Sequence, residues 1–168
     1  MGNSVNTNMS QHIPAALIQK SAGTWTPTLA SNVLSDNRTA ADATFNLFIP
    51  IMIPGNAKAL QGARLKSIEV LYTVGTAAMD SVAAPELEKI SVSSPGAVTG
   101  AAVTTTQDTG HDAAAERITV ADHRMVISVT TPEWVDNDVY YNLYIACDAA
   151  ATSVFKLYGA IANFDLKV

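Results

Sequence analysis

Large apolar residues alternate with other residues in four long stretches of this chain. Every second residue is large and apolar from position 45 to 53, and the same period recurs at 68–74, 139–147 and 155–161. Successive side chains of a β-strand point to opposite faces, so this period predicts strands with one buried face. The predicted buried residues are Phe45, Leu47, Ile49, Ile51, Ile53, Ile68, Val70, Tyr72, Val74, Val139, Tyr141, Leu143, Ile145, Cys147, Phe155, Leu157, Gly159 and Ile161.

Shorter segments complete the predicted fold. Further strands are expected at 24–29, 88–93, 104–106, 117–121 and 125–130, with loops at 32–42 and 107–115 and a hairpin turn at 122–124. Pro50 predicts an edge strand or a break, because proline cannot donate to a ladder. A change of apolar phase between Ile161 and Phe164 predicts a β-bulge or a change of sheet. Eight or nine strands without a long amphipathic helix predict an all-β antiparallel sandwich, with the jelly roll as the favoured topology.

The start of the chain differs from the rest. Residues 1–10 are polar and without period, and one short apolar patch follows at Ile13, Leu17 and Ile18. We expect residues 1–22 to form an extended N-terminal arm that serves attachment and stays outside the core. Residues 23–168 are expected to form a single sandwich domain.

The composition indicates which partners the chain has. Charged residues make up only 15% of the sequence and the net charge is -5, with the basic residues scattered. Nucleic-acid binding needs clustered Lys and Arg, so we expect no nucleic-acid partner. The sequence shows no secretory signal and no apolar stretch long enough for a bilayer, so we expect synthesis in a cytoplasm and no membrane partner. Few charges and many small side chains favour packing against other protein subunits.

Groups that could support catalysis or bind a metal fall in turn-like segments. They are Asp108, His111 and Asp112 in one loop, and Asp122 and His123 in another. A general base needs a partly dry pocket, whereas these loops are expected to be solvated. The turn at residues 136–138 could hold calcium, but Asp and Asn are ordinary turn formers and the plain turn is favoured. Cys147 is expected to be a small buried hydrophobe. We therefore expect no catalytic, cofactor-binding or metal-binding residue, and no enzymatic activity.

A second set of aromatic residues lies on the other face of the strand at 139–147. Tyr140 and Tyr144 share a face opposite Tyr141, and we expect Tyr158 and Ala160 to extend that face in the next strand. Such a surface suits a subunit interface, or alternatively a platform for a sugar. The predicted interface residues are Ile13, Leu17, Ile18, Tyr140, Tyr144 and Tyr158.

The general character of the chain resembles structural proteins of tailed bacteriophages. The resemblance is carried by the polar arm at residues 1–22, the entry Gly23-Thr24-Trp25-Thr26-Pro27 and the segment at 153–160, and not by a diagnostic motif. It is closest to capsid decoration (cement) proteins and the head domains of fibres. The resemblance implies a homotrimer that projects from the virion while the arm grips the shell.

We therefore expect a non-enzymatic virion protein, made in the host cytoplasm, that binds the outside of a phage capsid through the major capsid protein or another virion protein. One alternative is a fibre or spike tip that recognises a host-surface glycan. Another is a free carbohydrate-binding module or a small hydrolase, although the sequence shows no paired acids in one cleft.

Overall fold

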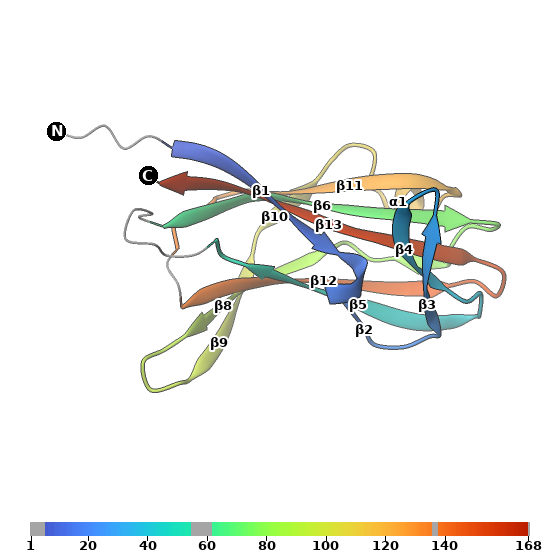
Figure 1. Ribbon diagram of the computed structural model, residues 1–168, viewed down its shortest axis with the longest axis horizontal. Coiled ribbons are helices and arrows are strands. Elements are labelled where there is room, and N and C mark those ends of the chain that lie inside the picture. Colours follow the sequence, from blue (N-terminus) through green and yellow to red (C-terminus); the bar gives the residue numbers. More distant parts are fainter. Residues whose placement is uncertain (1–5, 55–61, 136–137, 168) are drawn as a thin grey trace.

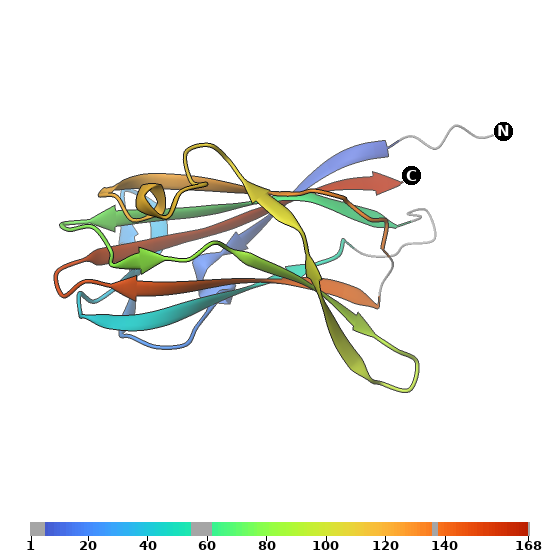
Figure 2. The same cartoon turned by 180° about the vertical axis from the view of Figure 1, so that it is seen from behind.

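Two antiparallel β-sheets packed face to face make up the molecule (Figures 1 and 2). The computed structural model describes residues 6–54, 62–135 and 138–167. Helices within these ranges are limited to a 3-10 turn η1 (Ala15–Leu17) and α1 (Ala114–Arg117). The predicted all-β sandwich is confirmed, whereas the strand order does not confirm a jelly roll.

Seven strands form sheet A, in the order β10-β11-β6-β13-β4-β3, with β1 also paired to β13. They are β1 (Asn6–Pro14), β3 (Trp25–Ala30), β4 (Val33–Arg38), β6 (Ala63–Gly75), β10 (Thr105–Gln107), β11 (Ala121–Val129) and β13 (Val154–Lys167). Six strands form sheet B, in the order β2-β5-β12-β8-β9, with β7 beside β12. They are β2 (Gln19–Lys20), β5 (Ala43–Met52), β7 (Ser81–Val82), β8 (Glu86–Val92), β9 (Val98–Val103) and β12 (Val139–Ala149).

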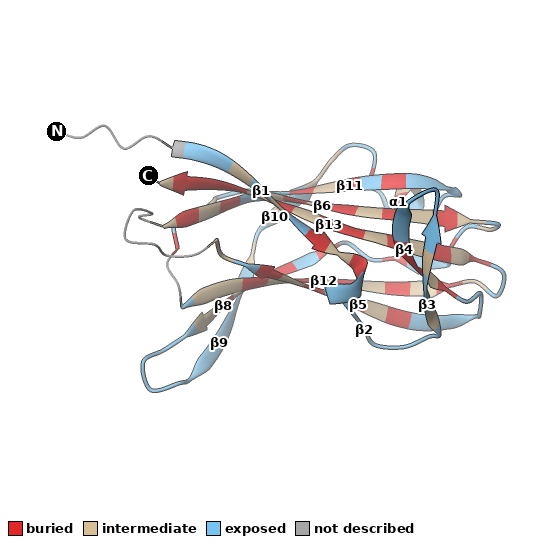
Figure 3. Cartoon of the chain, viewed as in Figure 1, coloured by how far each residue is buried: buried red, intermediate tan, exposed pale blue. Residues whose placement is uncertain are grey.

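The core lies between the two sheets, where buried positions alternate along the long strands (Figure 3). Nearly all of the predicted inward residues are buried. Ile53 and Val139 lie at strand ends and only pack against the margin of the core. Ile161 is half-exposed, so its prediction as an inward residue is wrong.

The error at Ile161 comes from the register of β13. The pairing of β13 with β6 shifts between Leu157 and Gly159 and again between Asn163 and Phe164. The first shift leaves Tyr158 as an extra residue, which turns Ala160 and Ala162 inward and Ile161 outward. The predicted bulge near Phe164 is confirmed, but the change of phase in β13 occurs earlier, at Tyr158.

The N-terminal segment belongs to the sandwich. β1 pairs with β13 along its whole length, and β2 pairs with β5 of the other sheet. Ile13 and Ile18 are 4% and 2% exposed within the core. The prediction that this segment stays outside the core, with both side chains free to dock on a partner, is therefore wrong. The physical reason is that β4 covers only residues 155–157 of β13, and β1 covers the edge that remains.

Several local predictions are corrected by tertiary pairing. The predicted loop at 32–42 contains β4, joined to the edge strand β3 by Ser31 and Asn32, whose φ values of 51° and 64° suit a two-residue hairpin turn. The predicted turn at 122–124 lies inside β11, and α1 occupies part of the predicted strand at 117–121. β5 runs unbroken through Pro50 and is close to an edge, since β2 pairs with only two of its residues.

Candidate functional site

A groove lies on the outer face of sheet A where β13 changes partners. β13 pairs with β4 up to Leu157 and with β1 from Gly159 onward, so Tyr158 stands at the junction. The hairpin β3–β4 forms one wall through Val33 and Leu34, and β1 with η1 forms the other through Pro14 and Ala15. The groove has a volume of about 550 Å³, and an adjoining depression of about 420 Å³ shares Val33, Asp122 and Tyr158 with it.

Gly159 makes this junction possible. Its φ is +138°, and a Cβ placed there would lie 2.4 Å from the backbone carbonyl oxygen of Ile13. Only glycine lets β1 cross so close to β13 in this conformation. The bulge and the glycine together turn the Tyr158 side chain to the outer face.

The floor of the groove carries a short chain of polar groups. The Thr73 hydroxyl donates to Asp122 Oδ1 at 2.5 Å, and the Tyr158 hydroxyl lies 3.2 Å from the same Thr73 oxygen. Thr73 has a single hydrogen to give, so the Tyr158 hydroxyl is the donor in that second contact. Among the described residues Asp122 forms no ion pair. Asp122 lines both depressions, so its carboxylate can accept a further hydrogen bond there.

The outer face of sheet B is a separate apolar surface. Phe48 and Tyr144 are cross-strand neighbours with ring centroids 5.1 Å apart, and Met52 is the neighbour of Tyr140. Phe48 and Met52 are 40% and 59% exposed. Two of the predicted interface residues, Tyr140 and Tyr144, thus lie together on one open face.

Contrary to the prediction from their parity, Tyr158 and Ala160 do not extend that face. Both lie in sheet A, where Tyr158 points to the opposite outer surface and Ala160 is fully buried. Of the remaining predicted interface residues, Leu17 is 62% exposed on η1. The six residues therefore occupy the core and separate surfaces, and do not form a single interface.

A buried cluster joins the two polar loops that were predicted to be solvated. His111 Nδ1 lies 2.8 Å from Asp108 Oδ2, and His111 Nε2 lies 3.2 Å from His123 Nδ1. His123 Nε2 donates to the Thr119 carbonyl at 2.9 Å. Both histidines are buried, and the His123 ring stacks on Tyr72 at 4.5 Å. The prediction of solvated histidines is wrong because β11 places His123 on its inward face.

The acceptors at the two ends of the cluster fix where its imidazole hydrogens point. The Thr119 carbonyl and the Asp108 carboxylate only accept, so each requires a hydrogen on the imidazole nitrogen that faces it. Burial by itself raises the pKa of Asp108, but hydrogen bonds from His111 and the Val126 amide lower it overall.

The cluster anchors the segment between β10 and β11. Arg117 is buried and donates to the carbonyls of His111 and Val82, while the Tyr72 hydroxyl donates to the Arg117 carbonyl. Among the described residues no serine, threonine or cysteine side chain hydrogen bonds to either imidazole. The arrangement therefore lacks a nucleophile within reach of its bases.

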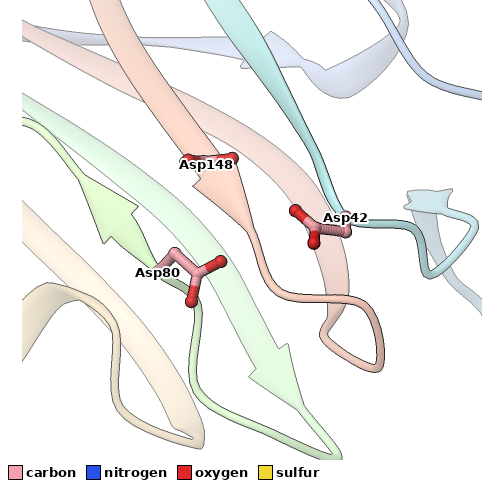
Figure 4. A group of neighbouring side chains, drawn as sticks. All are labelled: Asp42, Asp80 and Asp148. Carbon is pink, nitrogen blue, oxygen red and sulfur yellow. The ribbon is translucent and has the colours of Figure 1, made fainter.

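Three carboxylates gather at one end of the sandwich (Figure 4). Carboxylate oxygens of Asp42, Asp80 and Asp148 lie within 4.8 Å of one another, and none forms an ion pair with a described residue. Calcium takes roughly six to eight oxygen ligands, so these residues alone do not complete a site. Sequence reasoning missed the cluster because its members come from two separate connections and from strand β12, and share no spacing. They repel one another, which destabilises this end of the fold.

Arg38 lies beneath this end and is 2% exposed. Its guanidinium donates to the carbonyls of Ala41 and Ala43 and packs over the Phe45 ring at 4.8 Å. Burial lowers the pKa of Arg38, and the negative charge of Asp148 opposes that shift. Arg38 thus holds the connection that carries Asp42.

The predictions for Cys147 and for the turn at 136–138 have different outcomes. Cys147 is buried as predicted, and burial raises the pKa of its thiol to about 12, so it is not a nucleophile. Asp136 and Asn137 lie outside the described residues, so the plain turn predicted at 136–138 stays a prediction.

No protein-family model and no curated protein matches the chain. Within the described ranges, neither helix has the length or apolar character to span a bilayer. The function is therefore argued from the geometry of the two outer faces.

Proposed function

We propose that the protein is a non-catalytic structural subunit of a phage particle, which assembles as a homotrimer and binds the outside of the capsid. The observation that carries the proposal is the open apolar face of sheet B. Aromatic and apolar residues follow one another across β5 and β12 on that face. Large residues of this kind, placed side by side on a rigid sheet, are typical of subunit interfaces.

The assignment to self-association rests on the composition of this face. Phe48, Met52, Tyr140 and Tyr144 carry no charge, and the acidic residues Glu86 and Glu88 lie to one side on β8. A surface with an uncharged centre and charges at its margin resembles the core and rim of a protein interface. The low overall charge favours close packing of identical subunits.

The oligomeric state tests the first part of the proposal. We expect size-exclusion chromatography with light scattering to give the mass of a trimer for the native chain. Phe48→Glu places a charge at the centre of the face and should yield monomers. Val120→Glu is the matched control, because Val120 is also an exposed apolar residue but lies outside sheet B. A monomeric native chain, or equal behaviour of the two variants, would overturn the assignment of this face.

Attachment to the particle tests the second part. We expect immunogold labelling of phage particles to mark the outside of the head at regular positions. Labelling confined to tails or fibres would refute the capsid location and leave self-association intact. Absence of label from particles would refute the virion role.

A further inference from the structure

We infer that the groove beside Tyr158 binds an uncharged carbohydrate. The groove lies on sheet A, on the opposite side of the sandwich from the apolar face of sheet B. It stays open whether or not the subunits associate through sheet B. The inference therefore does not depend on the assembly proposed above.

The shape of the groove suits a short chain of linked rings. The two adjoining depressions have volumes of about 550 and 420 Å³, and each falls within the roughly 300–1,000 Å³ of small-molecule sites. Tyr158 and Asp122 line both depressions, so a ligand that extends from one to the other passes over the same aromatic and the same carboxylate. The hairpin β3–β4 follows the ligand along one side through Val33.

The chemistry of the groove combines an aromatic floor with hydrogen-bonding groups that match hydroxyls. A tyrosine offers an apolar ring on which the C–H face of a sugar can lie. The Asp122 carboxylate can accept a hydrogen bond from a hydroxyl, and the Asn32 amide can both donate and accept. Apolar side chains from Pro14, Val33 and Leu34 complete the walls.

The charges of the groove favour a neutral ligand. Asp122 contributes one negative charge, and Lys156 of the adjoining depression contributes one positive charge. Lys156 and Asp122 are both register neighbours of Thr73 on the outer face, one on each side of it. A phosphate or a nucleic acid would meet the Asp122 carboxylate at the floor of the groove. Bringing a second negative charge out of water beside this carboxylate is costly. A neutral sugar incurs no such cost.

Saturation-transfer NMR with defined trisaccharides tests the inference. The probes are maltotriose, chitotriose and mannotriose, each at millimolar concentration with the native full-length chain. We expect saturation transfer to the ring protons of at least one probe. Amide shifts in a two-dimensional spectrum should then cluster around residues 32–34, 122 and 158. No transfer to any of the three probes would overturn the inference.

Matched variants locate the site. Tyr158→Ala should weaken the binding of that probe by roughly tenfold, as expected for loss of a central aromatic contact. Tyr158→Phe keeps the ring and should retain most of the affinity. Trp134→Ala is the control, because it removes a partly exposed aromatic side chain that lines neither depression, and it should bind as the native chain does. Equal loss in the two alanine variants, or shifts that map to sheet B, would show that the groove is not the site.

Discussion

Replacing Gly159 by alanine should strongly destabilise the fold at the junction of β1, β4 and β13. The added Cβ would lie 2.4 Å from the Ile13 carbonyl oxygen and 3.3 Å from Pro14 Cα. Both are backbone atoms of β1, so no flexible side chain can move aside. The substitution therefore either strains β13 or displaces β1 from the edge of sheet A.

Two costs contribute to the expected effect. A residue other than glycine at a φ of +138° is strained by roughly 1–3 kcal/mol. Overpacking in a tight site adds about 1–3 kcal/mol. The free energy of unfolding should thus fall by about 2–6 kcal/mol. Even the lower end corresponds to a decrease in Tm of roughly 4–8 °C for a chain of this size.

Urea denaturation and thermal melting, both followed by circular dichroism, measure this effect. Gly75→Ala is the control, because Gly75 has no positive φ and its added Cβ would meet Val154 at an ordinary 3.7 Å. The control should change stability by less than about 1 kcal/mol, and in the stabilising direction. If Gly159→Ala melts within 1 °C of the native chain, the close crossing of β1 over β13 is refuted.

Four other predictions concern the cluster at His111, the acids, the N-terminal segment and the thiol. Asp108→Asn removes the carboxylate that accepts from the His111 imidazole and the Val126 amide, and should cost about 1–3 kcal/mol at pH 7 in urea denaturation. Because the folded pKa of Asp108 is lowered, this stabilisation is present above the unfolded pKa and lost as pH falls, so the two chains should converge in acid; a difference independent of pH would refute the contribution of the Asp108 charge. Asp80→Asn should stabilise by about 0.5 kcal/mol at low salt and by less at 1 M salt, since Asp80 is exposed; a destabilised variant would contradict the repulsion within the acidic cluster. Deleting residues 1–20 should lower the free energy of unfolding by more than about 3 kcal/mol, because it uncovers the edge of β13 and removes two buried isoleucines from the core. An unchanged Tm would instead support an N-terminal arm that lies outside the core. Cys147 should not react with a thiol reagent until the chain unfolds, and rapid labelling of the native protein would contradict its burial.

The alternating pattern predicted the long strands because the period of two is a local property of the chain. β5, β6 and β12 each place large apolar residues on one face, and no distant contact is needed to identify that face. β4 was missed for the opposite reason. Its sequence contains Ser35, Asp36 and Arg38, and all three are buried. The carbonyls that accept from Arg38 lie shortly after it in the sequence, but Lys20, which pairs with Asp36, comes from β2, so the strand depends on a partner in another element.

The buried histidines could not be predicted from spacing. Asp108 and His111 sit in the connection that follows β10, while His123 is the inward neighbour of Tyr72 across β11 and β6. A polar residue in a short segment is expected to be exposed unless a partner is known. Here Asp108 lies close to His111 in the sequence, but His123 comes from another strand. Only the topology brings the three side chains together and makes their burial favourable.

The junction at Tyr158 did leave a signal in the sequence. A glycine inside a strand that is otherwise rich in large residues indicates a bulge or the close approach of another backbone, and Gly159 is such a residue. Both conditions hold here, since β13 bulges at Tyr158 and β1 crosses next to Gly159. β13 is longer than either strand that shares this edge, so the edge must be divided between β4 and β1. β4 pairs with β13 up to Leu157 and β1 pairs with it from Gly159, so a gap remains between the two strands. The bulged residue Tyr158 lies at the floor of this gap. The groove is thus a consequence of the unequal strand lengths in sheet A.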